Sequence, residues 1–109
     1  MPIIVVLSIS RRNCNLTQEQ VARLSDRSQQ LIGKLEQGKA KGIGFETLSQ
    51  LCKVTEGELG NVIAYISDDP RELDDNLTKL SKKLGCSTEE IWPHIPEEIR
   101  RAYRSWRSF

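Results

Sequence analysis

Two short helical patterns in close succession, at residues 17–25 and 28–37, constrain the fold of this chain more than any other feature. The first begins with Thr17, a favoured N-cap residue, and Gln20 follows three positions later, which is the spacing of a capping box. The second begins with Ser28, another favoured N-cap residue. Two helices joined by so short a turn have to cross, and their apolar faces have to share a common core.

The apolar residues of the two patterns fit a helix-turn-helix. Ala22 is small enough to let the second helix cross close over the first. Val21, Ile32 and Leu35 are spaced to pack against a third helix. The second helix of such a motif is the one that enters the major groove of DNA. The spacing therefore predicts a DNA-binding unit in which residues 28–37 form the recognition helix.

Two adjacent glutamines stand at the start of this helix. Gln29 and Gln30 follow the cap and point away from the core, toward whatever the helix end meets. A glutamine amide offers a donor and an acceptor together and pairs with the N6 and N7 atoms of adenine. Lys34, one turn further along, is placed to reach guanine or a phosphate. The pair therefore predicts direct base contacts, with solvated surface as the alternative.

Other polar residues predict contacts to the DNA backbone. Gln18 begins the preceding helix, where backbone N–H groups and the helix dipole favour a phosphate. Lys39 and Lys41 lie in the loop after the recognition helix, where they would position the protein without reading sequence; a solvated loop is the alternative. Arg11 and Glu36 are candidates for a salt bridge that fixes the recognition helix, with unrelated surface charges as the alternative.

The composition limits the classes of function. The net charge is +1, so binding to nucleic acid has to rest on local patches. One histidine (His94), no recognisable pair of catalytic carboxylates and no glycine-rich phosphate loop argue against an enzyme. No apolar run approaches the ~20 residues of a membrane span. The odd number of cysteines fits reduced thiols and a cytoplasmic location. A zinc site is the less favoured alternative to buried thiols, because the possible ligands are not closely paired in the sequence: Cys14, Cys52, Cys86 and His94. We therefore expect no metal and no cofactor.

The flanking segments predict a mainly α fold with a small β ribbon. Residues 3–9 are rich in β-branched residues, which favours a strand, although strand and helix stay open there. Residues 45–52 have helical spacing, with Phe45 in the apolar stripe, and Thr55 is read as the cap of a further short helix. The segment from Asp68 to Pro70 is the best boundary, so we expect one domain at 1–67 and a helical extension at 71–109.

The extension allows more than one function. A leucine stripe predicts a buried face on its first helix, formed by Leu73, Leu77, Leu80 and Leu84. Ser87 and Glu90 form another capping-box pattern, but Glu89 and Glu90 at that helix start would repel phosphates, which disfavours a second DNA reader. Pro96 opens a last helix whose aromatics, Tyr103 and Trp106, are read as core residues, with nucleic-acid stacking among arginines as the alternative.

Residues 16–59 resemble the Cro and phage-repressor type of helix-turn-helix domain, the xenobiotic-response-element family. The residues that carry the resemblance are Thr17, Gln18, Ala22, Ser28, Ile32, Glu36, Gly38, Phe45 and Leu48, together with the register of the paired glutamines. The resemblance implies a five-helix domain, and in one subgroup an N-terminal strand that pairs after the fifth helix, here residues 3–7 with 62–66. It implies base readers at Gln29, Gln30 and Lys34, and an Arg11–Glu36 bridge.

The same resemblance implies phosphate contacts from Gln18, Gln37, Lys39 and Lys41. With the two cap residues, the predicted DNA-binding set is Thr17, Gln18, Ser28, Gln29, Gln30, Lys34, Gln37, Lys39 and Lys41. The chain departs from the family pattern at Asp26 (usually glycine), at Arg27 (usually apolar) and at Gly44, where repressors of this type carry a minor-groove arginine. Gly33 also weakens the recognition helix, by about 1 kcal/mol relative to alanine.

The expected function is therefore that of a sequence-specific, double-stranded DNA-binding transcriptional regulator, a repressor that acts as a homodimer. Residues 71–109 would supply the dimer contact or bind a protein partner. The alternative is a protein-interaction module, such as an antitoxin or anti-repressor, that uses the same scaffold against protein.

Overall fold

The computed structural model describes residues 3–108. The chain divides into two compact units, one formed by residues 5–63 and the other by Ile3, Ile4 and residues 64–108. The chain passes between them through a two-stranded antiparallel ribbon of β1 (Ile3–Val5) and β2 (Ile63–Tyr65). Each unit has its own helices, and each is described by itself.

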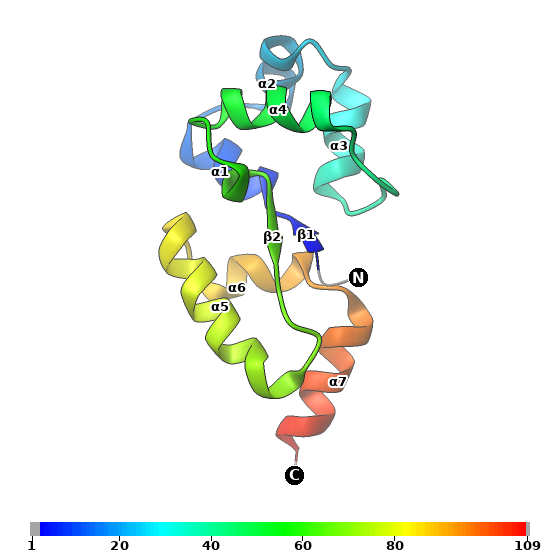
Figure 1. The fold of residues 1–109 in the computed structure, drawn as a ribbon, viewed down its shortest axis with the longest axis vertical. Helices are drawn as coiled ribbons and strands as arrows, with labels where there is room; N and C mark the ends of the chain where they lie inside the picture. The colour runs from blue at the N-terminus through cyan, green and yellow to red at the C-terminus, as the bar shows by residue number, and fades with distance from the viewer. Residues whose placement is uncertain (1–2, 109) are drawn as a thin grey trace. The chain divides into compact units, whose positions relative to one another are not determined.

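The first unit is built from four α-helices and a short helical turn (Figure 1). The helices are α1 (Leu7–Asn13), α2 (Gln18–Ser25), α3 (Gln29–Glu36) and α4 (Phe45–Val54), and the turn is the 3₁₀ segment η1 (Leu59–Asn61). This confirms the predicted mainly helical fold, although the fifth helical piece is a single 3₁₀ turn. The core contains Leu7, Val21, Ala22, Ile32, Leu35, Leu48, Leu51 and Val62.

The ends of α2 and α3 are set by local hydrogen bonds. The Thr17 hydroxyl accepts from the backbone N–H of Gln20 at 3.1 Å, and the Gln20 side chain accepts from the Thr17 N–H at 2.8 Å, which completes the capping box. Ser28 caps α3 by accepting from the Leu31 N–H at 3.1 Å. Asp26 ends α2 in the left-handed conformation, with φ of 56°, where the family usually has glycine. These contacts make the turn between α2 and α3 sharp.

The N-terminal segment divides between strand and helix. The β ribbon pairs the two segments that the sequence predicts to pair, and next to it the Val6 N–H donates to the Val62 carbonyl at 2.8 Å. The strand is shorter than residues 3–9, because Leu7 begins α1. Leu7 and Ile9 are both buried in that helix. Burial on a helical face has therefore overridden the β propensity of these residues.

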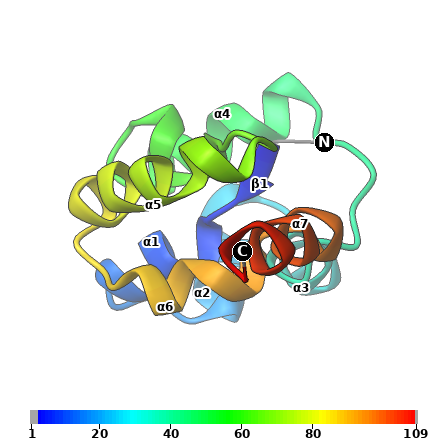
Figure 2. The ribbon, with the colours of Figure 1, turned by 90° about the horizontal axis from the view of Figure 1, so that it is seen from below.

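The second unit consists of α5 (Pro70–Leu84), α6 (Thr88–Ile91), the 3₁₀ segment η2 (Trp92–His94) and α7 (Glu97–Arg107). Helix α5 packs against both α6 and α7 (Figure 2). The core of the second unit contains the predicted leucine stripe and three isoleucines: Leu73, Leu77, Leu80, Leu84, Ile91, Ile95 and Ile99. Gly85 ends α5 with φ of 66°, a conformation that a side chain would strain.

Three local expectations were wrong. Thr55 does not cap a following helix; it ends α4, and its hydroxyl donates to the Leu51 carbonyl at 2.8 Å. Phe45 is 90% exposed, because the first residue of α4 lies beyond the edge of the core. Trp106 is 39% exposed near the end of α7, so its ring is only partly covered.

Candidate nucleic-acid interface

The tip of α3 presents free amides to solvent. Gln29 and Gln30 are the first two residues of the helix, and both are exposed. Neither side chain makes a hydrogen bond or ion pair with any of residues 3–108. Lys34 is exposed one turn further along the helix. The tip therefore carries unused donors and acceptors, because the serine cap rather than a glutamine satisfies the helix end.

The far end of α3 is held by a partly buried polar network. Arg11 donates to the Glu36 carboxylate through Nε at 2.7 Å and Nη2 at 3.0 Å. The two side chains are 15% and 6% exposed, respectively. Arg11 also donates to the Leu16 carbonyl at 2.9 Å, and Gln18 donates to Glu36 at 2.8 Å. This network joins α1, the start of α2 and the end of α3, so it fixes the direction in which the α3 tip points.

Gln18 is therefore already engaged through its side-chain amide. Its backbone N–H is the first of α2, and the first N–H groups of a helix have no partner within the helix. A phosphate at this position would meet backbone donors and the positive end of the helix dipole. This geometry is compatible with the main-chain phosphate contact expected at Gln18 from the sequence, because the side-chain amide is already bonded to Glu36.

The loop after α3 turns its two lysines outward. Gln37 ends the helix, and Gly38 follows with φ of 72°. Ala40 and Ile43 pack partly against the core of the first unit. Lys39 and Lys41, on either side of Ala40, are exposed. The packed Ala40 and Ile43 thus leave two positive charges on the side of the loop that faces solvent.

One of the three comparisons with known proteins gave a match, and it covers the helix-turn-helix. The family model described as helix-turn-helix matches residues 9–60, which span α1 to η1. Residues 9–60 are a helix-turn-helix domain of the Cro and phage-repressor type. Comparisons with curated proteins and with solved structures gave no match. The domain belongs to a DNA-binding regulatory family that is generally not enzymatic.

Two features of the helix-turn-helix domain were missed from the sequence. The departure at Arg27 has a structural role, since its Nε donates to the Thr47 hydroxyl at 3.0 Å and links the turn to α4. The spacing groups Leu24 with Val21 and Ala22 in the apolar stripe of α2, and this prediction is wrong, since Leu24 is 61% exposed whereas Val21 and Ala22 are buried. The Arg27–Thr47 contact could not be read from spacing, because it joins residues 20 positions apart in the chain.

The cysteines and the single histidine do not form a metal site in the described part of the chain. No group of three or more His, Cys, Asp or Glu side chains among residues 3–108 is placed to hold a metal ion. Desolvation by burial raises the pKa of the Cys14 and Cys52 thiols, which favours their protonated form. Among the same residues, no helix has both the length and the apolar character needed to cross a bilayer.

Proposed function

We propose that this DNA-binding regulator recognises a specific sequence, by inserting the α3 tip into the major groove so that Gln29 and Gln30 contact base edges. The observation that carries the proposal is that both amides are exposed and unpaired at a helix start that Ser28 already caps. Each amide is then available for a bidentate pair with adenine. Lys34 adds a contact to guanine or phosphate from the next turn.

The remaining predicted residues would hold the backbone of the duplex. Helix α2 offers its N-terminal N–H groups at Gln18, and the loop offers Lys39 and Lys41. Such contacts set affinity and its dependence on salt, whereas the base contacts set specificity. The proposed interface comprises Thr17, Gln18, Ser28, Gln29, Gln30, Lys34, Gln37, Lys39 and Lys41.

We further propose that the regulator is a cytoplasmic repressor that acts as a homodimer on a two-fold operator. One recognition helix covers only a few base pairs, and two copies multiply both affinity and specificity. The region 1–67 would act as the DNA-binding domain, and 71–109 would supply the dimer contact or a site for a protein partner.

Binding-site selection on random duplexes, repeated at several salt concentrations, tests the proposal. We expect enrichment of a motif, and we expect the Gln29→Ala, Gln30→Ala variant to lose at least about 30-fold in affinity for it, because each of the two bidentate base contacts is worth about 1–3 kcal/mol and about 1.4 kcal/mol is a tenfold change. Failure to enrich any motif would rule out sequence-specific recognition. Full affinity and specificity in the double variant would favour the alternative, an antitoxin or anti-repressor that binds protein.

A further inference from the structure

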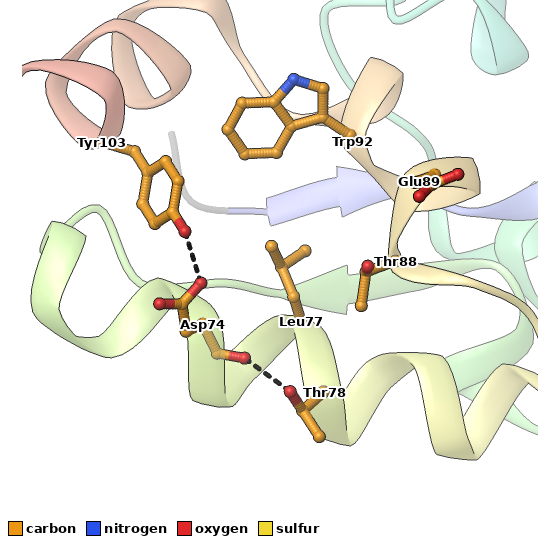
Figure 3. Close-up of a pocket in the computed structure, with 7 residues that line it drawn as sticks. All are labelled: Asp74, Leu77, Thr78, Thr88, Glu89, Trp92 and Tyr103. Atoms are coloured by element: carbon orange, nitrogen blue, oxygen red, sulfur yellow. Dashed lines mark hydrogen bonds between the residues drawn. The ribbon is translucent and has the colours of Figure 1, made fainter. Parts of the chain in front are cut away.

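The second unit contains a surface pocket of about 380 Å³ that the DNA-binding role does not use. It is lined by residues of α5, α6, η2 and α7, namely Asp74, Leu77, Thr78, Thr88, Glu89, Trp92 and Tyr103 (Figure 3). We call this pocket the aromatic recess. All of its residues belong to one compact unit, so its shape depends only on how that unit packs.

Two aromatic rings wall the aromatic recess. The rings of Trp92 and Tyr103 meet edge to face, with centroids 5.5 Å apart and planes at 65°. Leu77, which is buried, lies between the two sides of the recess, with Tyr103 and Asp74 on one side and Thr88 and Glu89 on the other (Figure 3). Aromatic faces carry partial negative charge and attract cations. The walls alone therefore favour a positively charged group with some apolar surface.

The charged groups at the aromatic recess also favour a positively charged ligand. The Tyr103 hydroxyl donates to the Asp74 carboxylate at 2.6 Å, which leaves the other carboxylate oxygen facing Arg107 at 3.4 Å. That hydrogen bond, with burial and the negative charge of Asp74, raises the pKa of Tyr103, so the ring stays uncharged. Glu89 is exposed and has no ionic or hydrogen-bonding partner among residues 3–108.

The chain itself shows that Tyr103 and Asp74 hold a cation. The guanidinium carbon of Arg107 lies 5.8 Å from the centroid of the Tyr103 ring, within the usual range of a cation–π contact. The same guanidinium contacts Asp74. Arg107 does not itself line the recess, and neither Trp92 nor Glu89 has a cation partner among residues 3–108.

We propose that the aromatic recess binds a monovalent organic cation, an alkylammonium or guanidinium group, beside the edge-to-face pair of Trp92 and Tyr103 and near the Asp74 and Glu89 carboxylates. Anions are excluded by the two carboxylates, and a neutral ligand would gain nothing from them. Four of the lining residues (Asp74, Thr78, Thr88 and Glu89) are exposed, so the recess opens to solvent. The cation has two sources with the same chemistry, a small free amine and a basic side chain on a polypeptide.

Tryptophan fluorescence gives a direct test, because the chain has only two tryptophans. In a Trp106→Phe background, the emission reports on Trp92 in the recess. The protein is titrated at constant ionic strength with choline, with the tripeptide Gly-Arg-Gly, and with the uncharged carbon isostere of choline. Calorimetric titrations run in parallel. We expect a saturable signal with at least one cation and none with the isostere, and the stronger of the two cations identifies the source.

Charge variants separate this proposal from general electrostatics. Asp74→Asn keeps a hydrogen-bond acceptor for Tyr103, and Glu89→Gln removes an exposed charge; each should weaken the cation about two- to fivefold, the range for an exposed ion pair. Glu98→Gln, on the exposed first turn of α7 and outside the recess, removes the same charge and should leave affinity unchanged. Equal binding of the isostere, equal effects of all three variants, or no saturation by either method would overturn the proposal. None of these outcomes depends on whether the first unit reads DNA.

Discussion

Helices α3 and α6 begin in the same way and present opposite chemistry. Ser28 caps α3 by accepting the N–H of Leu31 at 3.1 Å, and Ser87 caps α6 by accepting the N–H of Glu90 at 3.3 Å. The residues that follow differ, since α3 shows two free amides and α6 shows two carboxylates. One of those carboxylates, that of Glu90, returns to the Ser87 N–H at 3.1 Å.

This difference shows that the N-cap residue and the residues after it have separate roles. The serine decides where each helix starts, because it satisfies an N–H group that the helix cannot. The next residues decide what the positive end of the dipole attracts from outside. Amides leave the tip of α3 open to an electronegative groove, whereas the glutamates of α6 already compensate its dipole and would repel phosphate. Under the proposed function, helix-turn-helix spacing alone is therefore not sufficient for DNA recognition.

The largest expected effect on stability concerns the Arg11–Glu36 ion pair at the C-terminal end of α3. Arg11→Met leaves the carboxylate of Glu36, whose side chain is 6% exposed, without its charged partner. We expect a loss of about 3 kcal/mol in the free energy of unfolding, since removing one member of a buried ion pair leaves an uncompensated charge. Urea denaturation measures this loss. The Arg11→Met, Glu36→Leu double variant is the control and should recover much of it; a single variant as stable as the parent chain would show that the pair does not hold the domain.

The two caps give a smaller and more discriminating effect. Ser28→Ala and Ser87→Ala should each cost about 1 kcal/mol of stability, because each leaves a helix N–H without its acceptor. Only Ser28→Ala should also weaken DNA binding, since it loosens the helix that carries the residues proposed to contact bases. Denaturation and DNA titration on both variants test the pair. Equal losses of DNA affinity in both would contradict the distinction between the tips.

The smallest effect belongs to the loop lysines. Lys39→Ala and Lys41→Ala should each weaken binding to all sequences alike and lower the slope of log affinity against log salt by about 1, the value for one phosphate contact. Fluorescence anisotropy with specific and random duplexes at several salt concentrations measures both quantities. Lys82→Ala on α5, an exposed lysine outside the proposed interface, is the matched control. A change in sequence preference in either loop variant would mean that the lysines read bases.

Local signals predicted much of the first unit. Cap residues and apolar spacing depend only on neighbours in the chain, so the capping box at Thr17 and the ends of α2 and α3 follow from the sequence. The pairing of the two strand segments also followed, through the resemblance to a family with such a ribbon. The leucine stripe of α5 is buried as its spacing predicts.

Features that depend on tertiary packing did not follow. The segment around Leu7 and Ile9 is helical because the core buries its apolar face, which β propensity cannot show. The exposure of Phe45 depends on where α4 enters the unit. The side-chain bond from Gln18 to Glu36 and the aromatic recess join residues far apart in the chain, 18 positions in the first case. A local sequence pattern does not show which residues far apart in the chain come into contact.

The central claim is that the amides at the α3 tip contact the DNA bases. The measurement that tests it most directly gives α3 the tip chemistry of α6, in the Gln29→Glu, Gln30→Glu variant, with stability and DNA affinity measured on the same preparation. Carboxylates at a helix N-terminus stabilise it by about 0.3–1 kcal/mol each, so the variant should be at least as stable as the parent chain. Its affinity for the selected duplex should fall to the level of a random one. A variant that keeps its preference for the selected duplex would contradict the account.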